Sequence, residues 1–162
     1  MNTLSVLIEF KLERQKANWE FEMEHDTEVY KEGLDFINEY NQCFCDRDIE
    51  ALKEMYATNA FTVFWDNHSG CDSGNLTDHL SKVSEFFQHG KQTESGAIEP
   101  LLIEDSQTRS SDGTLIVTAL LRYQSAPTPG VRSIFVLMKD DHRWKAMHIH
   151  HSFDPNEVKQ PI

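Results

Sequence analysis

The chain has 162 residues, of which 39% are hydrophobic and 26% charged, a composition typical of one globular domain with its own core. Its 27 acidic residues outnumber the 15 basic ones and give a formal net charge of −12 at pH 7, which disfavours contact with nucleic acid or anionic membranes. The three cysteines form no paired framework, and no apolar run approaches the roughly 20 residues of a membrane span. We therefore expect neither a nucleic-acid nor a membrane partner, and a cytoplasmic location.

The first half of the chain is predicted to be helical. Residues 1–24 contain no Gly or Pro and are rich in Glu, Lys, Leu and Phe, which indicates a helical extension, either peripheral or packed on a second subunit. Apolar residues at helical spacing predict a helix over 27–45. Asp48 is placed to cap a short helix over 49–57, and a further helix is expected over 77–89.

The rest of the chain is rich in β-branched and aromatic residues and predicts strands joined by short turns. The expected strands are residues 60–65, 95–105, 115–124, 132–139 and 144–153, with turns at 111–113 and 127–130. Helices followed by a run of antiparallel strands indicate an α+β domain. A long, strongly bent sheet wrapped around the helices leaves a conical cavity on its concave side, the usual place for a ligand.

Histidines lie on both faces of the last predicted strand. Side chains alternate along a strand, so His148 and His150 share one face with Trp144, whereas His151 lies on the other. Two histidines at this spacing can chelate a metal, but no third ligand lies at a recognised spacing. The competing interpretation is a dimer interface on that face. We prefer the interface, and we expect neither a metal nor a cofactor.

Two segments carry a resemblance to a known superfamily. The first spans residues 40–61 and includes the letters DRDIEAL; the second spans residues 143–152 and reads RWKAMHIHHS. They resemble the opening and the closing strand of the nuclear-transport-factor-2-like (NTF2-like) superfamily, in its SnoaL-like branch. The chain is also similar to ketosteroid isomerase and to the association (hub) domain of calcium/calmodulin-dependent kinase II.

This resemblance covers about residues 27–155. It implies one NTF2-like domain over residues 25–162 behind the helical extension of residues 1–24. The implied fold is cone-shaped and cystatin-like, an α+β arrangement in which a curved antiparallel sheet wraps around the N-terminal helices. This superfold hosts many unrelated functions, so the resemblance specifies the fold better than the activity.

Against ketosteroid isomerase, the resemblance preserves one of three functional groups. It places Tyr40 at the oxyanion-hole tyrosine and Phe64 at the aspartate general base. It places Ile134 or Phe135 near the protonated aspartic acid. An enolising isomerase needs a base and a second hydrogen-bond donor, and phenylalanine supplies neither. Steroid isomerisation is therefore excluded as the activity.

Against the kinase hub, the resemblance implies a largely apolar, weakly basic pocket. Two pocket-facing arginines of that domain fall at Phe135 and His151, while Asp66 shares its strand parity with Phe64. The predicted ligand-pocket residues are Tyr40, Tyr56, Phe64, Asp66, Phe135 and His151. Structural roles remain the alternative: core packing for the tyrosines, loop capping for Asp66, and an internal hydrogen bond for His151.

Two functions remain open from the sequence. One is a pocket for a small apolar or carbonyl-containing molecule, with the reaction unassigned; the other is a non-enzymatic dimerisation or assembly module of the same fold. A homodimer fits both, because an apolar sheet face is too large to leave in water. The predicted face consists of Ile134, Val136, Met138, Trp144 and Ala146. Uncharged histidines buried beside it predict a dimer that weakens below about pH 6.

Overall fold

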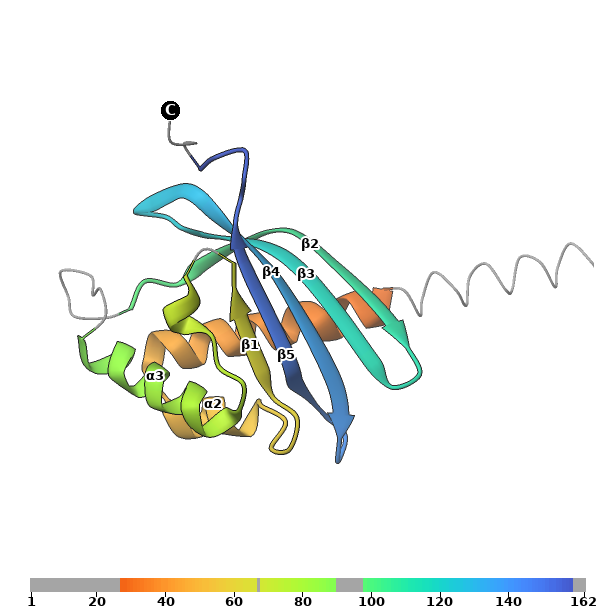
Figure 1. Ribbon diagram of the computed structural model, residues 1–162. Helices are drawn as coiled ribbons and strands as arrows, with labels where there is room; N and C mark the ends of the chain where they lie inside the picture. Colours follow the sequence, from red (N-terminus) through yellow and green to blue (C-terminus); the bar gives the residue numbers. More distant parts are fainter. Residues whose placement is uncertain (1–26, 67, 90–97, 159–162) are drawn as a thin grey trace, which may run out of the picture.

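A five-stranded, curved sheet packs its inner face against the helices (Figure 1). The structure, a computed structural model, describes residues 27–66, 68–89 and 98–158, so the predicted helix over 1–24 lies outside the described residues. The strands follow the spatial order β1-β5-β4-β3-β2. They are β1 (Thr62–Trp65), β2 (Leu101–Ser111), β3 (Thr114–Tyr123), β4 (Ala126–Asp140) and β5 (Arg143–Phe153).

A helix over residues 27–46 lies across the inner face of the sheet, in agreement with the predicted 27–45. Its buried side chains recur at helical spacing and form one face. They are Val29, Phe36, Ile37, Tyr40 and Cys43. Gly33 lies among them, where the Thr108 side chain of β2 leaves no room for a Cβ atom. The close approach of helix and sheet at this point therefore requires glycine.

Helix α2 (Ile49–Glu54) is capped by Asp48 as predicted, but it ends before the predicted residue 57. The Ala57 amide donates to the Ala146 carbonyl of β5 at 2.8 Å, and the Ala146 amide donates to the Met55 carbonyl at 2.8 Å. These two bonds divert the backbone from the helix into a bridge with β5. The helix ends early because its last residues bond to the sheet.

Helix α3 (Leu76–His89) follows the short 3-10 turn η1 (Ser69–Cys71) and begins one residue before the predicted 77. Its buried side chains are spaced by four residues and face the sheet; they are His79, Val83 and Phe87. Within the described parts of the chain, no helix is long and apolar enough to cross a membrane.

The sheet is mixed. Strands β2, β3, β4 and β5 pair antiparallel, whereas β1 pairs parallel with β5. The prediction of a wholly antiparallel sheet was therefore wrong at the β1 edge. Parallel neighbours need a long crossover, and here the chain between them passes through α3 and the other three strands before it returns as β5.

Several strand limits differ from the sequence prediction; β1, for example, begins at Thr62 instead of residue 60. Strand β2 covers residues 101–111, whereas 95–105 was predicted, and residues 95–97 of that prediction lie outside the described residues. The turn between β3 and β4 lies at Gln124 and Ser125 instead of 127–130. The residues expected to form that turn belong to β4, beyond the last pair it makes with β5, Val131 with Phe153. Pro127 and Pro129 have no backbone N–H to donate to a neighbouring strand. They are tolerated there because β4 has no β5 neighbour at that end.

A bulge in β5 changes which side chains face the helices. Leu137 pairs with Ala146, whereas Val136 pairs with His148. Met147 therefore has no partner on β4 and is the extra residue of the bulge. The alternation shifts by one position, and Ala146 is fully buried while Trp144 packs against the core. The assignment of Trp144 and Ala146 to the outer face was therefore wrong, whereas His151 is buried on the inner face as predicted.

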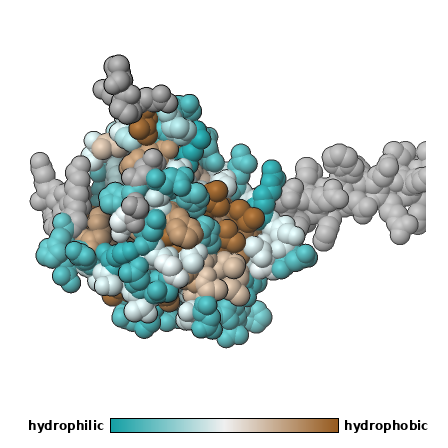
Figure 2. Space-filling view, viewed as in Figure 1, coloured by the Kyte–Doolittle hydropathy of each residue, from teal (hydrophilic) through white to brown (hydrophobic). Residues whose placement is uncertain are grey.

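The outer face of the sheet keeps several exposed hydrophobic side chains. Figure 2 shows hydrophobic residues over β3 and β4 within a mostly polar surface. The exposed fractions are 46% for Phe64, 41% for Ile116, 40% for Ile134 and 38% for Met138. The two faces of the sheet thus differ in burial, although both carry apolar residues.

Candidate functional site

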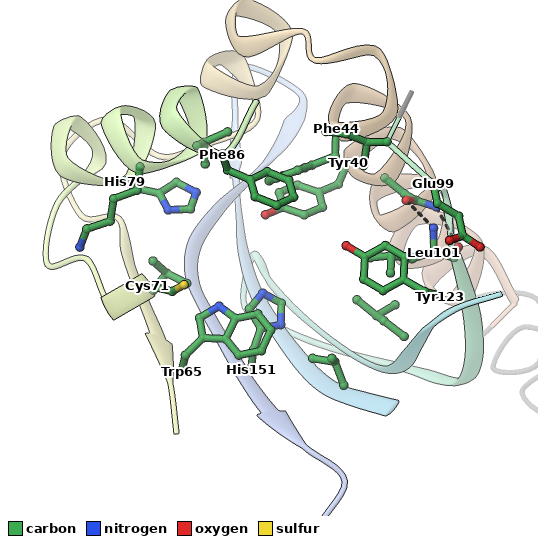
Figure 3. A pocket seen from close by; sticks show the side chains of 17 residues that line it. Tyr40, Phe44, Trp65, Cys71, His79, Phe86, Glu99, Leu101, Tyr123 and His151 are labelled. Carbon is green, nitrogen blue, oxygen red and sulfur yellow. Dashed lines mark hydrogen bonds between the residues drawn. The ribbon is translucent and has the colours of Figure 1, made fainter. Parts of the chain in front are cut away.

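A cavity of about 330 Å³ lies between the inner face of the sheet and the helices (Figure 3). Most of its side chains are aliphatic or aromatic, so the walls are largely apolar. The lining residues are Tyr40, Asn41, Phe44, Val63, Trp65, Cys71, His79, Lys82, Val83, Phe86, Ile98, Glu99, Leu101, Leu121, Tyr123, Val131 and His151. They come from the first helix, α3 and all five strands, together with the segments that join them.

His151 of β5 is a deeply buried titratable group at the cavity wall. Its Nδ1 atom lies 2.7 Å from Ser133 Oγ on β4, and its ring packs against Trp65 with centroids 4.5 Å apart. Burial lowers the pKa of His151 to about 3, with smaller contributions from His150 and His79. The imidazole is therefore uncharged at neutral pH.

Two tyrosines and a histidine form a buried hydrogen-bonded chain. The Tyr56 hydroxyl donates to Tyr40 Oη at 3.4 Å, and His79 Nε2 lies 3.0 Å from Tyr56 Oη. Since a phenol has one proton and that of Tyr56 goes to Tyr40, His79 Nε2–H donates to Tyr56. Burial lowers the pKa of His79 to about 4 and raises the pKa of Tyr40 to about 12, so the chain is neutral. The Tyr40 hydroxyl ends this chain at the cavity wall and keeps its own proton.

The charged side chains of the lining are held by partners in the protein. Lys82 Nζ bonds to Asp78 at 2.9 Å and to the Asp72 carbonyl oxygen. The Glu99 carboxylate accepts from the Ser125 amide at 2.8 Å and from the Ser125 hydroxyl. Both side chains already have hydrogen-bond partners within the protein, so neither needs a ligand to supply them.

The remaining titratable groups of the wall are also neutral. Burial raises the pKa of the Cys71 thiol and of the Tyr123 hydroxyl. Cys71 Sγ lies 3.3 Å from His68 Nδ1 at the start of η1. A cavity with these groups offers hydrogen bonds and apolar contact, and little electrostatic attraction for an ion.

Comparison with known proteins identifies the fold. No protein-family profile matches the sequence, and no curated protein matches it. A calcium/calmodulin-dependent kinase II hub from S. rosetta matches with a TM-score of 0.59 at 23% identity, over 76% of this chain and 95% of that one. An NTF2-like protein of unknown function from Pseudomonas putida KT2440 matches with a TM-score of 0.59 at 14% identity, over 84% and 93%. A cystatin-like protein of unknown function from Nostoc punctiforme gives 0.59 at 6%, over 75% and 88%.

The fold is that of NTF2-like proteins. At these identities the likeness establishes the fold alone. The predicted α+β, cystatin-like architecture is thus confirmed.

Within this NTF2-like fold, four of the predicted pocket residues lie on the inner side. Tyr40 and His151 line the cavity. Tyr56 and Phe135 are fully buried and lie behind the wall, so they correct the prediction that both line the pocket. Phe135 supports the two lining residues, with ring centroids 5.4 Å from Tyr40 and 6.0 Å from His151.

The other two predicted pocket residues, Phe64 and Asp66, lie on the opposite side of the sheet. The Phe64 ring packs against His148 with centroids 5.6 Å apart, and Asp66 accepts from His150 Nε2 at 2.9 Å. Both placements correct the prediction, and the reason is strand parity. Val63 of β1 is buried in the core, so alternation turns Phe64 outward.

Most of the lining residues were not predicted, and Trp65 and His79 are two of them. Trp65 lies two positions after Val63 in β1, so both side chains are on the same face of the strand and line the cavity (Figure 3). His79 is on the buried face of α3, spaced by four residues from Val83 and Phe87. That helical spacing is visible in the sequence and marks His79 as an inward residue.

The paired histidines of the outer face have hydrogen-bond partners of their own. His148 Nδ1 lies 2.8 Å from Thr62 Oγ1, and His150 pairs with Asp66. Among the residues that the structure describes, no group of three His, Cys, Asp or Glu side chains is arranged to hold a metal ion.

Proposed function

We propose that this domain binds a small, uncharged and largely apolar molecule in the cavity. The observation that carries the proposal is a volume of about 330 Å³ with apolar walls, at which the buried polar groups are neutral. Ligand cavities of roughly 300–1,000 Å³ have this character, with a few polar groups that fix orientation. Ionic ligands are disfavoured, since Lys82 and Glu99 are engaged with protein partners.

The Tyr40 hydroxyl suits a carbonyl oxygen of the ligand. It accepts from Tyr56 and directs its own proton toward another acceptor, and a carbonyl is such an acceptor. The proposal includes binding and no reaction. Phe64 occupies the position of the isomerase base and faces outward, away from the cavity. The Glu99 carboxylate already accepts hydrogen bonds from the Ser125 amide and the Ser125 hydroxyl.

The test is a titration with N-phenyl-1-naphthylamine, an uncharged apolar probe whose fluorescence rises in apolar sites. The wild-type domain should bind it saturably. Leu121→Trp fills the cavity and should weaken binding at least tenfold, whereas Leu102→Trp, at a residue 45% exposed, should leave it unchanged. Circular dichroism checks that both variants fold. Equal binding by the two variants would rule out the cavity as the site.

We also propose that the domain forms a homodimer through the outer face of the sheet. Phe64, Ile116 and Ile134 leave a large apolar surface there, and the fold likeness to a kinase hub agrees with assembly. Light scattering at micromolar concentration should give a dimer for the wild type. Ile134→Lys should give a monomer, while Val158→Lys, at an exposed apolar residue outside the sheet, should remain dimeric. A monomeric wild type rejects this interface.

A further inference from the structure

His151 meets the cavity with one ring nitrogen only. Its Nδ1 atom is 2.7 Å from Ser133 Oγ, and Ser133 is itself only 1% exposed. A buried hydroxyl proton needs an acceptor, and Nδ1 is the acceptor that the described residues provide for Ser133. Ser133 therefore donates to Nδ1, and the ring proton resides on Nε2.

The Nε2–H group is left to the cavity. Among the described residues, none is hydrogen-bonded to it. His151 is only 8% exposed and lines the cavity. Trp65 and Phe135 flank the ring at centroid distances of 4.5 and 6.0 Å and restrict its rotation. A ligand without an acceptor would cover this donor and leave it unpaired, which is costly, whereas a ligand oxygen accepts from it and removes that cost.

We infer that His151, held as its Nε2–H tautomer by Ser133, selects ligands that carry an uncharged carbonyl acceptor on an aromatic skeleton. The aromatic side chains of Phe44, Trp65 and Phe86 line the same cavity and suit such a skeleton. This inference rests on the proposed function and names the ligand class of that same cavity. Hydrocarbons leave the Nε2–H unpaired. Carboxylates lose their hydration and find no free cation, because the Lys82 ammonium is bound to Asp78 and to the Asp72 carbonyl.

Three matched naphthalenes test this selection by displacement of N-phenyl-1-naphthylamine at pH 7.5. They are 2-ethylnaphthalene, without an acceptor, 2-acetylnaphthalene, with a ketone, and 2-naphthoate, with a carboxylate. The ketone should bind about tenfold more tightly than the hydrocarbon, which corresponds to about 1.4 kcal/mol. The carboxylate should bind most weakly.

Variants assign the preference to a side chain. His151→Phe should lose most of the preference for the ketone, down to about threefold or less with Tyr40 as the remaining donor, and should keep the hydrocarbon affinity within about twofold of the wild type. Tyr40→Phe should retain a preference for the ketone. The inference is overturned if the wild type binds the ketone and the hydrocarbon with equal affinity, or if His151→Phe keeps the full preference for the ketone. Saturable binding of the probe would in either case leave the proposed function intact. Absence of probe binding removes both.

Nitrogen-15 NMR of the wild-type protein tests the tautomer without a core substitution. At pH 7 the His151 spectrum should show a protonated Nε2 and an unprotonated Nδ1, and added 2-acetylnaphthalene should shift the Nε2–H resonance. Ser133→Ala should abolish the single-tautomer pattern. A proton on Nδ1 in the wild type contradicts the inference, whatever the stability of the His151→Phe variant.

Discussion

The two faces of the sheet place neighbouring residues of one strand in opposite environments. His151 on the inner face is buried, held by Ser133, and burial lowers its pKa to about 3. His150, one residue earlier, lies on the outer face and bonds to the exposed Asp66 carboxylate. The same residue type is thus an uncharged donor at the cavity and a surface partner outside. The face, more than the residue type, decides its chemistry.

Phenylalanine substitutions should produce the largest difference between the faces. Phe135→Ala should destabilise the fold by about 3–5 kcal/mol, because it empties a fully buried site beneath Tyr40 and His151. Phe64→Ala on the outer face should cost under about 1 kcal/mol when both variants are compared in the monomeric Ile134→Lys background, since Phe64 is 46% exposed in the single chain. Urea unfolding at pH 7.5 measures both. Similar losses for the two variants would contradict the assignment of the faces.

Acid should act through the inner-face histidines. Burial depresses the pKa of His151 to about 3 and of His79 to about 4, from an ordinary value near 6.5. As the pH falls, the unfolded chain binds a proton at each of these histidines before the folded protein does. Their contribution to the free energy of unfolding is therefore complete above pH 6.5 and is lost as the pH falls toward their pKa values in the folded protein. At pH 5 each of the two histidines should lower the free energy of unfolding by about 2 kcal/mol relative to pH 7.5.

Urea unfolding at pH 7.5, 6 and 5 measures this loss. The charged or titratable groups that act on the pair are Lys82 and Asp78 beside His79, and His150 beside His151. His151→Phe should reduce the dependence on pH by about half, since one of the two buried histidines is then missing. A free energy of unfolding that is the same at pH 7.5 and pH 5 argues against buried neutral histidines.

Dimerisation should respond to pH through the outer face. Burial lowers the pKa of His148, with a further contribution from His150, so protonation of His148 favours the state in which it is more exposed. We expect the dimer to weaken below about pH 6. Sedimentation at pH 8, 6.5 and 5 measures this, with His142→Gln in the β4–β5 hairpin as a control. Flat association over that range shows that His148 is not buried in the interface.

The smallest effect is expected at Asp66. Asp66→Asn should leave the affinity for N-phenyl-1-naphthylamine within about twofold and change stability by under about 1 kcal/mol, because its pair with His150 is exposed. A Leu121→Trp sample measured in parallel gives the size of a true cavity effect. A loss of probe affinity in Asp66→Asn comparable to that sample would return Asp66 to the pocket.

Local rules acting on the sequence determined much of this protein. Helical spacing located the helix over 27–46, a cap at Asp48 located the start of α2, and the turn at Asp112 and Gly113 located the β2–β3 hairpin. These features depend on residues a few positions apart, so they can be read along the chain. The inward position of His151 was implied by the resemblance to the kinase hub and agrees with strand alternation.

Tertiary structure alone decided which residues of β1 and β5 line the cavity. All of Thr62–Trp65 favours a strand and shows no alternation of polar and apolar residues, so its inner face is set by pairing with β5 and by the bonds between Val63 and Ser73. The bulge at Met147 likewise reverses the parity of Trp144 and carries no local signal. Long-range pairing chooses between the two faces of a strand, and here that choice placed Trp65 in the cavity and Phe64 outside it.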